Sequence, residues 1–366
     1  MQRALLAAVL TLVCAACAGQ NLIRTLHSPD EANTTLSASM FGTTVRISDE
    51  YLVTLGAASI LYVFDSDGTY LRSIQRTESP LAYAIAASRL AVGNGADVEL
   101  YDLSTGDLLT TIARPMDDDG SFGAALISMN GNILIGSPQG GSGSANDAGA
   151  VYQYNVAAGT LSVWSRPPVF AGLAEYGRTL VLAGRSALVG ANIPDPLNGT
   201  DAAQQIFILC SARGKAGAVV RRPLMSRISW TQGDNIASDG KQVFVGFGYN
   251  YHLYAGDQAV RPGGLWQLTR AGKPKGYTTN DQEFDTSLGA ALALWHKQLY
   301  VGAPQRSGNG QVPVYDIKHL TQVQTLQNPY PENVADFGKS VESSASRLVI
   351  SAADINTSAG VVYLYD

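Results

Sequence analysis

Asn132-Ile133-Leu134-Ile135-Gly136 is one of seven similar stretches in this 366-residue chain, each a short β-like run that ends in an apolar residue and then a small one. The small residues, which we call anchors, are Gly56, Gly93, Gly136, Gly190, Gly246, Gly302 and Ser351. Successive anchors are 37 to 56 residues apart. A period of this length is typical of one four-stranded blade per repeat. The spacing therefore predicts an all-β fold, a seven-bladed β-propeller.

Each repeat divides into four expected strands. The first begins near an aromatic residue followed by Gly, as in Phe122-Gly123, and the second ends at the anchor. The third ends in an aromatic followed by Asp or Asn, as in Tyr101-Asp102, whose polar side chain can open a turn. Degenerate forms of the aromatic-Gly pair are expected at Ala82-Tyr83 and Asp234-Asn235. Alternating apolar positions favour strands throughout, and no segment has a sustained helical period.

The two ends of the chain are expected to complete one blade together. The seventh repeat stops at Asp366, after its third strand, and so lacks an outer strand. A surplus strand-like segment, residues 21–26, resembles outer strands such as residues 70–74. Pairing it with the seventh repeat would remove two exposed sheet edges. We therefore predict a single domain over residues 19–366, whose last blade is closed by the N-terminal strand.

Residues 1–18 predict a secretory signal peptide. Arg3 precedes an apolar stretch, and a small-x-small cleavage signal ends at Ala18. The stretch is too short to span a bilayer stably. Lipidation of Cys17 is an alternative, although Cys14 occupies a position where a lipoprotein signal usually has Leu or Val. A leader retained as an anchor is a third. The expected location is secreted, extracellular or cell-surface, with membrane contact only if Cys17 is lipidated.

The cysteine and charge content argue against a disulfide-stabilised protein and against a nucleic-acid-binding protein. After the leader only Cys210 remains, so the mature chain can form no internal disulfide, and Cys210 is expected to be a buried small hydrophobic residue.

Charged residues are 15% of the chain and the net charge is −5. No cationic run exceeds Arg221-Arg222, so a nucleic-acid footprint is absent. Low charge suits an extracellular protein that is glycosylated or self-assembled. Glycosylation sequons begin at Asn33, Asn198 and Asn356.

The repeats resemble a known family. Residues 122–138 with 149–154 are similar to the FG-GAP repeat of the integrin α-subunit propeller. Residues 288–304 with 310–315 are a second match, and residues 337–365 are a third. The resemblance rests on repetition over almost all of the chain after the leader. It implies an extracellular ligand-binding or adhesion propeller whose contacts are made by loops on one face.

Calcium is not carried over from this resemblance. Many FG-GAP relatives hold the ion in an acidic loop between the first and second strands, where several oxygens converge. The corresponding loops here, such as residues 128–132 and 343–346, supply too few carboxylates, and no other cofactor is implied. The densest acidic cluster lies before the third repeat and favours a solvated turn over a metal site. Its members, the weak metal candidates, are Asp117, Asp118 and Asp119.

The sequence predicts no enzyme. The four histidines have no spacing that places two on one strand face, and no hydrolase, zinc-protease or phosphate-loop motif is present. They are His27, His252, His296 and His319.

Long connections between the second and third strands are the candidate binding region. In a propeller they emerge on the same face as the connections between blades, and binding residues concentrate on such loops. The candidate ligand-binding residues lie in the fifth repeat: Tyr249, Tyr251, His252, Tyr254 and Arg261. Aromatic side chains can stack on sugars or anchor a protein interface, or alternatively fold back on their own loop.

The expected function is therefore a secreted, non-enzymatic binding or adhesion propeller. Its partner would be a glycan or an extracellular protein, recognised through the long-loop face. The alternative is a structural subunit of an extracellular filament, sheath or coat, which the low charge content and the lack of catalytic motifs favour.

Overall fold

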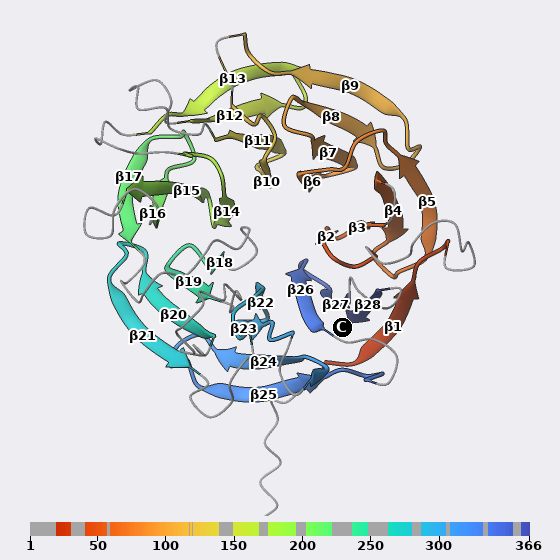
Figure 1. The fold of residues 1–366 in the computed structure, drawn as a ribbon, viewed down its shortest axis with the longest axis vertical. Helices are drawn as coiled ribbons and strands as arrows, with labels where there is room; N and C mark the ends of the chain where they lie inside the picture. The colour runs from red at the N-terminus through yellow and green to blue at the C-terminus, as the bar shows by residue number, and fades with distance from the viewer. Residues whose placement is uncertain are drawn as a thin grey trace, which may run out of the picture.

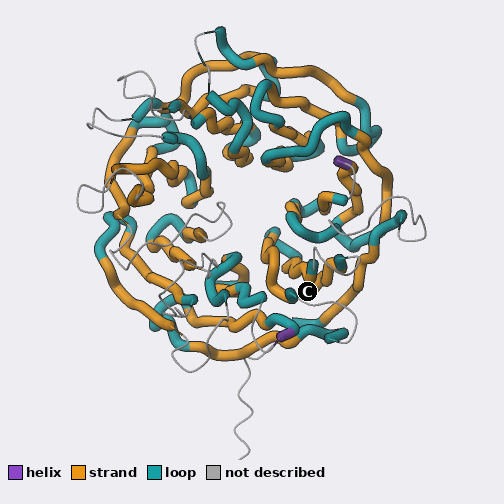
Figure 2. Tube along the Cα trace, viewed as in Figure 1, coloured by secondary structure: helices purple, strands orange, loops and turns teal. Residues whose placement is uncertain are grey.

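The computed structural model describes residues 20–30, 41–56, 59–116, 118, 120–138, 149–167, 175–194, 203–221, 236–247, 263–279, 287–304, 308–331, 336–353 and 360–366. These residues form seven four-stranded antiparallel sheets arranged as blades around a central axis (Figure 1). Strands make up nearly all of the regular structure (Figure 2). The predicted seven-bladed β-propeller is confirmed. Among the described residues no helix has the length and apolarity needed to cross a bilayer.

The first six blades are up-and-down meanders. In each, the first strand along the chain is the innermost and the fourth is the outermost. Blades one to three contain β2 (Val45–Ile47), β3 (Tyr51–Leu55), β4 (Ile60–Asp65), β5 (Tyr70–Gln75), β6 (Ala82–Ala86), β7 (Arg89–Gly93), β8 (Asp97–Asp102), β9 (Leu108–Ala113), β10 (Ala125–Met129), β11 (Asn132–Ser137), β12 (Ala150–Asn155) and β13 (Thr160–Ser165). Blades four to six contain β14 (Leu180–Ala183), β15 (Ser186–Pro194), β16 (Ala203–Cys210), β17 (Ala216–Arg221), β18 (Ile236–Ser238), β19 (Gln242–Phe247), β20 (Gly264–Thr269), β21 (Pro274–Thr279), β22 (Leu292–Trp295), β23 (Gln298–Val301), β24 (Gln311–Asp316) and β25 (Gln322–Gln327).

The seventh blade joins the two ends of the chain. It contains β26 (Phe337–Ser343), β27 (Leu348–Ala352), β28 (Val361–Tyr365) and, on the outside, β1 (Leu22–His27). Strand β1 runs antiparallel to β28, with Thr25 opposite Tyr363, and Asn21 exchanges backbone hydrogen bonds with Asp366. Leu26 is 4% exposed and packs with the cluster that contains Phe41. The predicted closure by the N-terminal strand is thus confirmed.

The apolar core lies between neighbouring blades. Burial in this core explains why an aromatic residue precedes the glycine of each aromatic-Gly pair. Phe122 is fully buried, and its ring centroid lies 5.6 Å from that of Tyr152 on β12 of the same blade. Phe337 and Tyr363 repeat this contact at 5.5 Å in blade seven. Edge-to-face contacts of this kind stabilise aromatic pairs beyond the area that they bury.

The anchor glycines are needed where consecutive blades touch. A Cβ on Gly136 of blade three would overlap the backbone carbonyl of Gly177, the glycine of the aromatic-Gly pair in blade four. The same relation joins Gly93 to Gly123, Gly246 to Gly289, and Gly302 to Gly338. At the ring closure Ser351 replaces the anchor glycine, and the Cβ position of Gly42 lies 3.3 Å from the Ser351 Cβ. At these four junctions the anchor glycine of one blade therefore contacts the aromatic-Gly glycine of the next, backbone to backbone.

Two assignments made from the sequence are wrong by a few residues. Leu55, not Gly56, matches the other anchors, because its N–H bonds to Thr44 O as the Gly302 N–H bonds to Ala291 O. Ala82 pairs with Gly93 as Ala125 pairs with Gly136, so Ser79-Pro80, and not Ala82-Tyr83, matches Phe122-Gly123. The junction between blades one and two thus lacks both glycines. The pair Leu55-Gly56 also consists of an apolar residue followed by Gly, and this placed the first anchor one residue too late.

The meander gives the propeller two different faces. Turns that join first to second and third to fourth strands lie on one face, which we call the short-turn face. Connections from second to third strands, and from each blade to the next, lie on the other, the long-loop face. Since β28 and β1 meet at Asp366 and Asn21, these residues lie at the short-turn face.

Buried phenols predict a loss of stability at alkaline pH. Burial, followed by the hydrogen bond to Glu99, raises the pKa of Tyr101 to about 12, and burial raises the pKa of Tyr300 to about 12. An unfolded tyrosine titrates near 10. Between these values the unfolded chain loses protons that the native phenols keep, so the free energy of unfolding falls as the pH rises through the window. Denaturant titrations at pH 9 to 12 should show this fall, and a weaker one in Tyr101→Phe. A profile that Tyr101→Phe leaves unchanged would contradict the assignment.

Candidate functional site

The centre of the ring holds a cavity of about 730 Å³. Its walls come from the innermost strand of every blade, namely β2, β6, β10, β14, β18, β22 and β26. Residues of the connections into the blades, among them Leu81 and Ser121, line its end at the long-loop face. A propeller produces such a channel because the seven innermost edges face one another without pairing.

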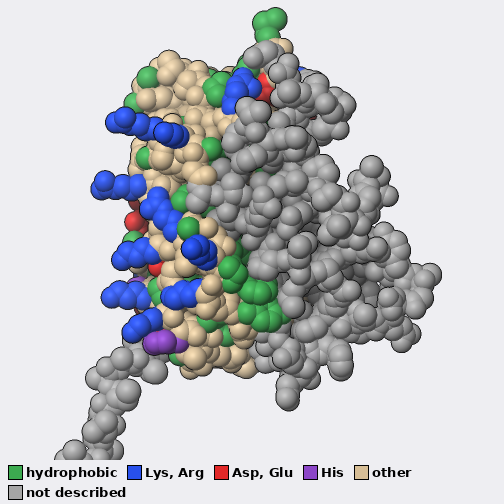
Figure 3. Space-filling model, turned by 90° about the vertical axis from the view of Figure 1, so that its left-hand side faces the viewer, with side chains coloured by type: hydrophobic (Ala, Val, Ile, Leu, Met, Phe, Trp, Pro, Cys, Tyr) green, Lys and Arg blue, Asp and Glu red, His purple; other side chains and the backbone are tan. Residues whose placement is uncertain are grey.

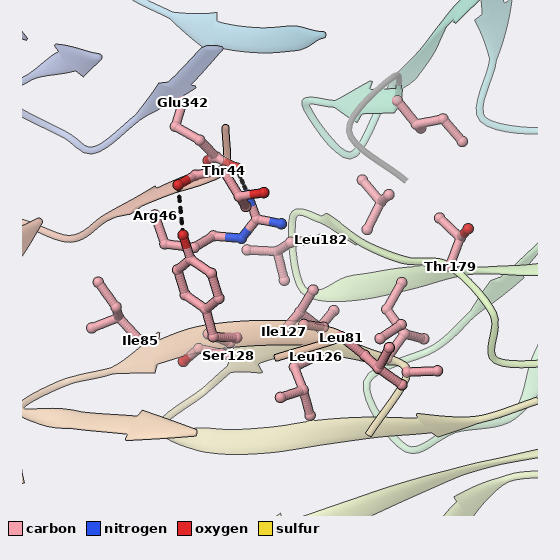
Figure 4. A pocket seen from close by; sticks show the side chains of 18 of the residues that line it. Thr44, Arg46, Leu81, Ile85, Leu126, Ile127, Ser128, Thr179, Leu182 and Glu342 are labelled. Carbon is pink, nitrogen blue, oxygen red and sulfur yellow. Dashed lines mark hydrogen bonds and ion pairs between the residues drawn. The ribbon is translucent and has the colours of Figure 1, made fainter. Parts of the chain in front are cut away.

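An ion pair crosses the channel wall where the ring closes. Arg46 Nη1 on β2 lies 2.7 Å from Glu342 Oε1 on β26, and the Arg46 side chain extends toward this carboxylate (Figure 4). The Arg46 guanidinium also lies 5.8 Å from the centroid of the Tyr83 ring. The Tyr83 hydroxyl donates a 2.6 Å hydrogen bond to Thr44 O. Arg46 is thus held by an anion, a ring and the adjacent strand.

A second ion pair lies at the long-loop end of the channel. Arg178 Nη1 is 2.7 Å from Glu175 Oε1, three residues earlier, just before β14. Glu175 has a positive φ of 55°, and its carbonyl accepts the Arg178 N–H. With the pair at Arg46 and Glu342, these residues supply the only carboxylates and guanidinium groups among the described lining residues. The charges of the described wall therefore balance.

Several apolar side chains of the wall remain exposed to the channel. Leu81 and Leu182 remain 53% and 44% exposed although they line the cavity. Ile85 on β6 and Ile127 on β10, which are partly buried, also line the cavity (Figure 4). Apolar side chains that stay exposed inside a concavity favour binding of a ligand that covers them.

The chemical groups of this wall suit binding. The described lining residues include no His, Cys, Asp or Lys. No cluster of three or more potential metal ligands occurs in the part of the chain that the structure describes. The arrangement offers two oriented ion pairs, hydroxyls and exposed apolar side chains.

Most residues predicted from the sequence to bind ligands lie outside the described part of the chain. This holds for the five loop candidates, Tyr249, Tyr251, His252, Tyr254 and Arg261, for the sequons at Asn33, Asn198 and Asn356, for Asp117 and Asp119, and for the leader. They stay predictions.

Asp118 is described, and it caps a turn. It is 7% exposed, and its Oδ1 accepts hydrogen bonds from the Gly120 N–H and the Ser137 hydroxyl, both 2.8 Å long. These bonds connect the entry into blade three with the end of β11. Asp118 is thus engaged in holding the connection between blades.

Cys210 is a core residue, as predicted. It is fully buried, and its thiol lies 3.2 Å from the Tyr176 hydroxyl, which lies 2.7 Å from the Ser165 hydroxyl. Burial raises the pKa of the Cys210 thiol, so the reactive thiolate is disfavoured. This polar trio sits between blades three and four, away from the channel.

The residues of the channel could not be found by reading along the sequence. Arg46 and Glu342 are 296 positions apart and meet only because the ring closes. Each occupies an innermost strand, and that position is the one signal that could have marked them as channel residues.

Comparison with known proteins supports the propeller fold and assigns no function to the chain. No characterised protein family and no curated relative matches the sequence. Among solved structures, the Myceliophteria thermophila Cps50 (Swd1) beta-propeller domain is 12% identical, with a TM-score of 0.55 over 95% of this chain and 99% of that one. The Neurospora crassa Pan2 WD40 domain is also 12% identical, with a TM-score of 0.56 over 94% of each chain. The chain is thus similar to these propellers in architecture.

Proposed function

We propose that this protein is a non-enzymatic binding propeller, secreted or displayed at the cell surface, that recognises a protein or glycan partner at its long-loop face. The partner inserts an apolar group into the mouth of the central channel. The observation that carries this proposal is Leu81, which stays exposed at the long-loop end of a channel whose described charges balance, with Leu182 exposed further along the wall on β14. The loop tyrosines Tyr251 and Tyr254, which follow β19 in the chain, are expected on the same face and would add contacts at its rim.

The kinship with FG-GAP propellers belongs to this proposal. It is supported by the glycine contact between blades, which gives the two glycines of the motif one shared role. It is also supported by the buried aromatic that precedes the first glycine, since Phe122 and Phe337 make equivalent ring contacts. Adhesion through loops is the function that this kinship suggests.

Replacing Leu81 with Asp is expected to weaken partner binding at least about 10-fold, because a carboxylate at the mouth cannot be covered by an apolar group without losing its water. The measurement is retention on a glycan array and on immobilised surface-protein extract, with affinity then determined for each hit.

A matched control lies elsewhere on the ring. Leu108 on β9 is 51% exposed but lies on an outer strand, so Leu108→Asp should bind as the wild type does. Equal losses in both variants would mean that exposed leucines matter in general, and undiminished binding by Leu81→Asp would exclude the channel mouth. A wild type that binds neither array nor extract, but forms filaments visible by negative-stain microscopy, would favour the structural-subunit alternative.

A further inference from the structure

The short-turn face of blades four to six is strongly basic. Nine exposed Lys and Arg residues lie in or beside the turns that join β14 to β15, β16 to β17, β18 to β19, β20 to β21, β22 to β23 and β24 to β25. They are Arg185, Arg213, Lys215, Lys241, Arg270, Lys273, Lys275, Lys297 and Lys318, and we call them the basic patch. Seen from the edge of the disc, Lys and Arg side chains line one margin (Figure 3).

The turns of the basic patch are in direct contact across three blades. The Arg270 N–H bonds to Lys241 O within blade five, and the Arg270 guanidinium donates to the Ser186 hydroxyl of blade four over 3.2 Å. Gln267 Nε2 of blade five donates to Ile317 O in the last turn of blade six over 2.6 Å. The cations are therefore presented by turns that form one continuous surface.

The positive charge of this surface is not neutralised by the residues that the structure describes. Within the described residues none of the nine cations forms an ion pair with a carboxylate. The two carboxylates present in these turns are already engaged. Asp239 accepts the N–H groups of Lys241 and Gln242, and the His319 N–H lowers the pKa of Asp316 by bonding to it. Nine cations against two carboxylates leave a large net positive charge in a chain whose net charge is −5.

On the opposite side of the short-turn face the cations are paired with carboxylates, so the basic patch is confined to blades four to six. In the turns of blades one, two and seven, Arg89 pairs with Asp102 at 2.6 Å and Arg347 pairs with Asp67 at 2.7 Å. Arginines at equivalent turns are thus neutralised there. Unpaired cations repel one another, so a patch that keeps them exposed costs stability unless an external anion is present.

The N-terminal end of the described chain also lies at this face. Gln20, the first described residue, donates from Nε2 to the Tyr300 hydroxyl, and Tyr300 lies on β23, which begins just after Lys297. Any tether N-terminal to residue 20 would therefore hold the basic patch, and not the long-loop face, toward whatever surface the tether enters.

We propose that the basic patch docks on the surface of an anionic lipid bilayer and leaves the long-loop face free for the partner of the proposed function. The turns form an exposed face from three blades, which suits a planar partner. Six of the nine cations are lysines, which act as point charges and need no shaped phosphate pocket. Lysines near an anionic membrane contribute attraction individually, and their effects add.

Vesicle sedimentation tests this assignment. The purified protein should bind phosphatidylcholine vesicles that contain about one-third phosphatidylserine, should not bind pure phosphatidylcholine, and should be released by high salt. The double variant Lys241→Gln/Lys318→Gln, drawn from blades five and six, should bind about 30-fold more weakly, because each lysine adds a factor of about five.

The matched control removes two exposed cations from the other face. Arg166 follows β13 and Lys339 lies at the start of β26, both at the long-loop side, so Arg166→Gln/Lys339→Gln should bind as the wild type does. Equal loss in both double variants, or binding to uncharged vesicles, would overturn the proposal. So would tighter retention on dextran sulfate or duplex DNA than on the vesicles, or a dimer in light scattering that requires Lys241 and Lys318. Leu81→Asp should still bind vesicles, which separates this proposal from the proposed function.

Discussion

Deleting residues 20–26 is expected to lower the free energy of unfolding by more than about 5 kcal/mol. The deletion exposes the full edge of β28, whose backbone groups pair with β1, and removes Leu26 from its core cluster. Losing one buried leucine alone costs about 2–5 kcal/mol, and each buried backbone group left without a partner adds to this. Denaturant unfolding monitored by tryptophan fluorescence would measure the difference.

Two point variants make the same test without shortening the chain. Leu26→Ala should cost about 2–5 kcal/mol, because that side chain is 4% exposed. Ile23→Ala, in the same strand but 39% exposed, should change stability by less than about 1 kcal/mol. If the truncated protein and Leu26→Ala unfolded at the same denaturant concentration as the wild type, β1 would contribute nothing to closure.

The fold could be predicted because its signals are local and repeated. Each second strand has alternating apolar residues that end at a small residue, and seven copies remove the ambiguity of any single one. Closure could be predicted because a chain that ends at Asp366 leaves one blade short by one strand. The errors at Gly56 and Ala82-Tyr83 arose at the one junction where both contact glycines are absent, so the local signal there was missing.

The sites could not be predicted in the same way, because they depend on distances between blades. No run of cations marks the basic patch, since each turn supplies one to three of them and only the meander brings six turns to one face. The search for a nucleic-acid footprint in the sequence therefore missed a real concentration of charge. Arg46 and Glu342 likewise come together through ring closure. Sorting charged residues by the turn in which they fall, once the blades were assigned, would have found the patch.

Gly136→Ala is expected to be among the most destabilising single-methyl changes in this protein, at about 3 kcal/mol. The added Cβ would overlap the carbonyl oxygen of Gly177, and backbone can yield only by moving blade four away from blade three. Gly131→Ala is the matched control, because its Cβ would meet nothing within 4 Å, and its positive φ of 75° alone should cost about 1 kcal/mol.

The seventh blade allows the opposite comparison, because its anchor position already carries a side chain. Ser351 occupies the anchor position there, and the ring is spaced so that its Cβ lies 3.3 Å from the Cβ position of Gly42. That junction already accommodates a side chain, so Ser351→Ala should be far milder than Gly136→Ala, although it removes the hydroxyl that accepts the Ser340 N–H. Thermal or denaturant unfolding of the three variants measures all of these effects. Equal costs at Gly136 and Gly131 would mean that backbone conformation, and not contact between blades, explains the recurring glycines.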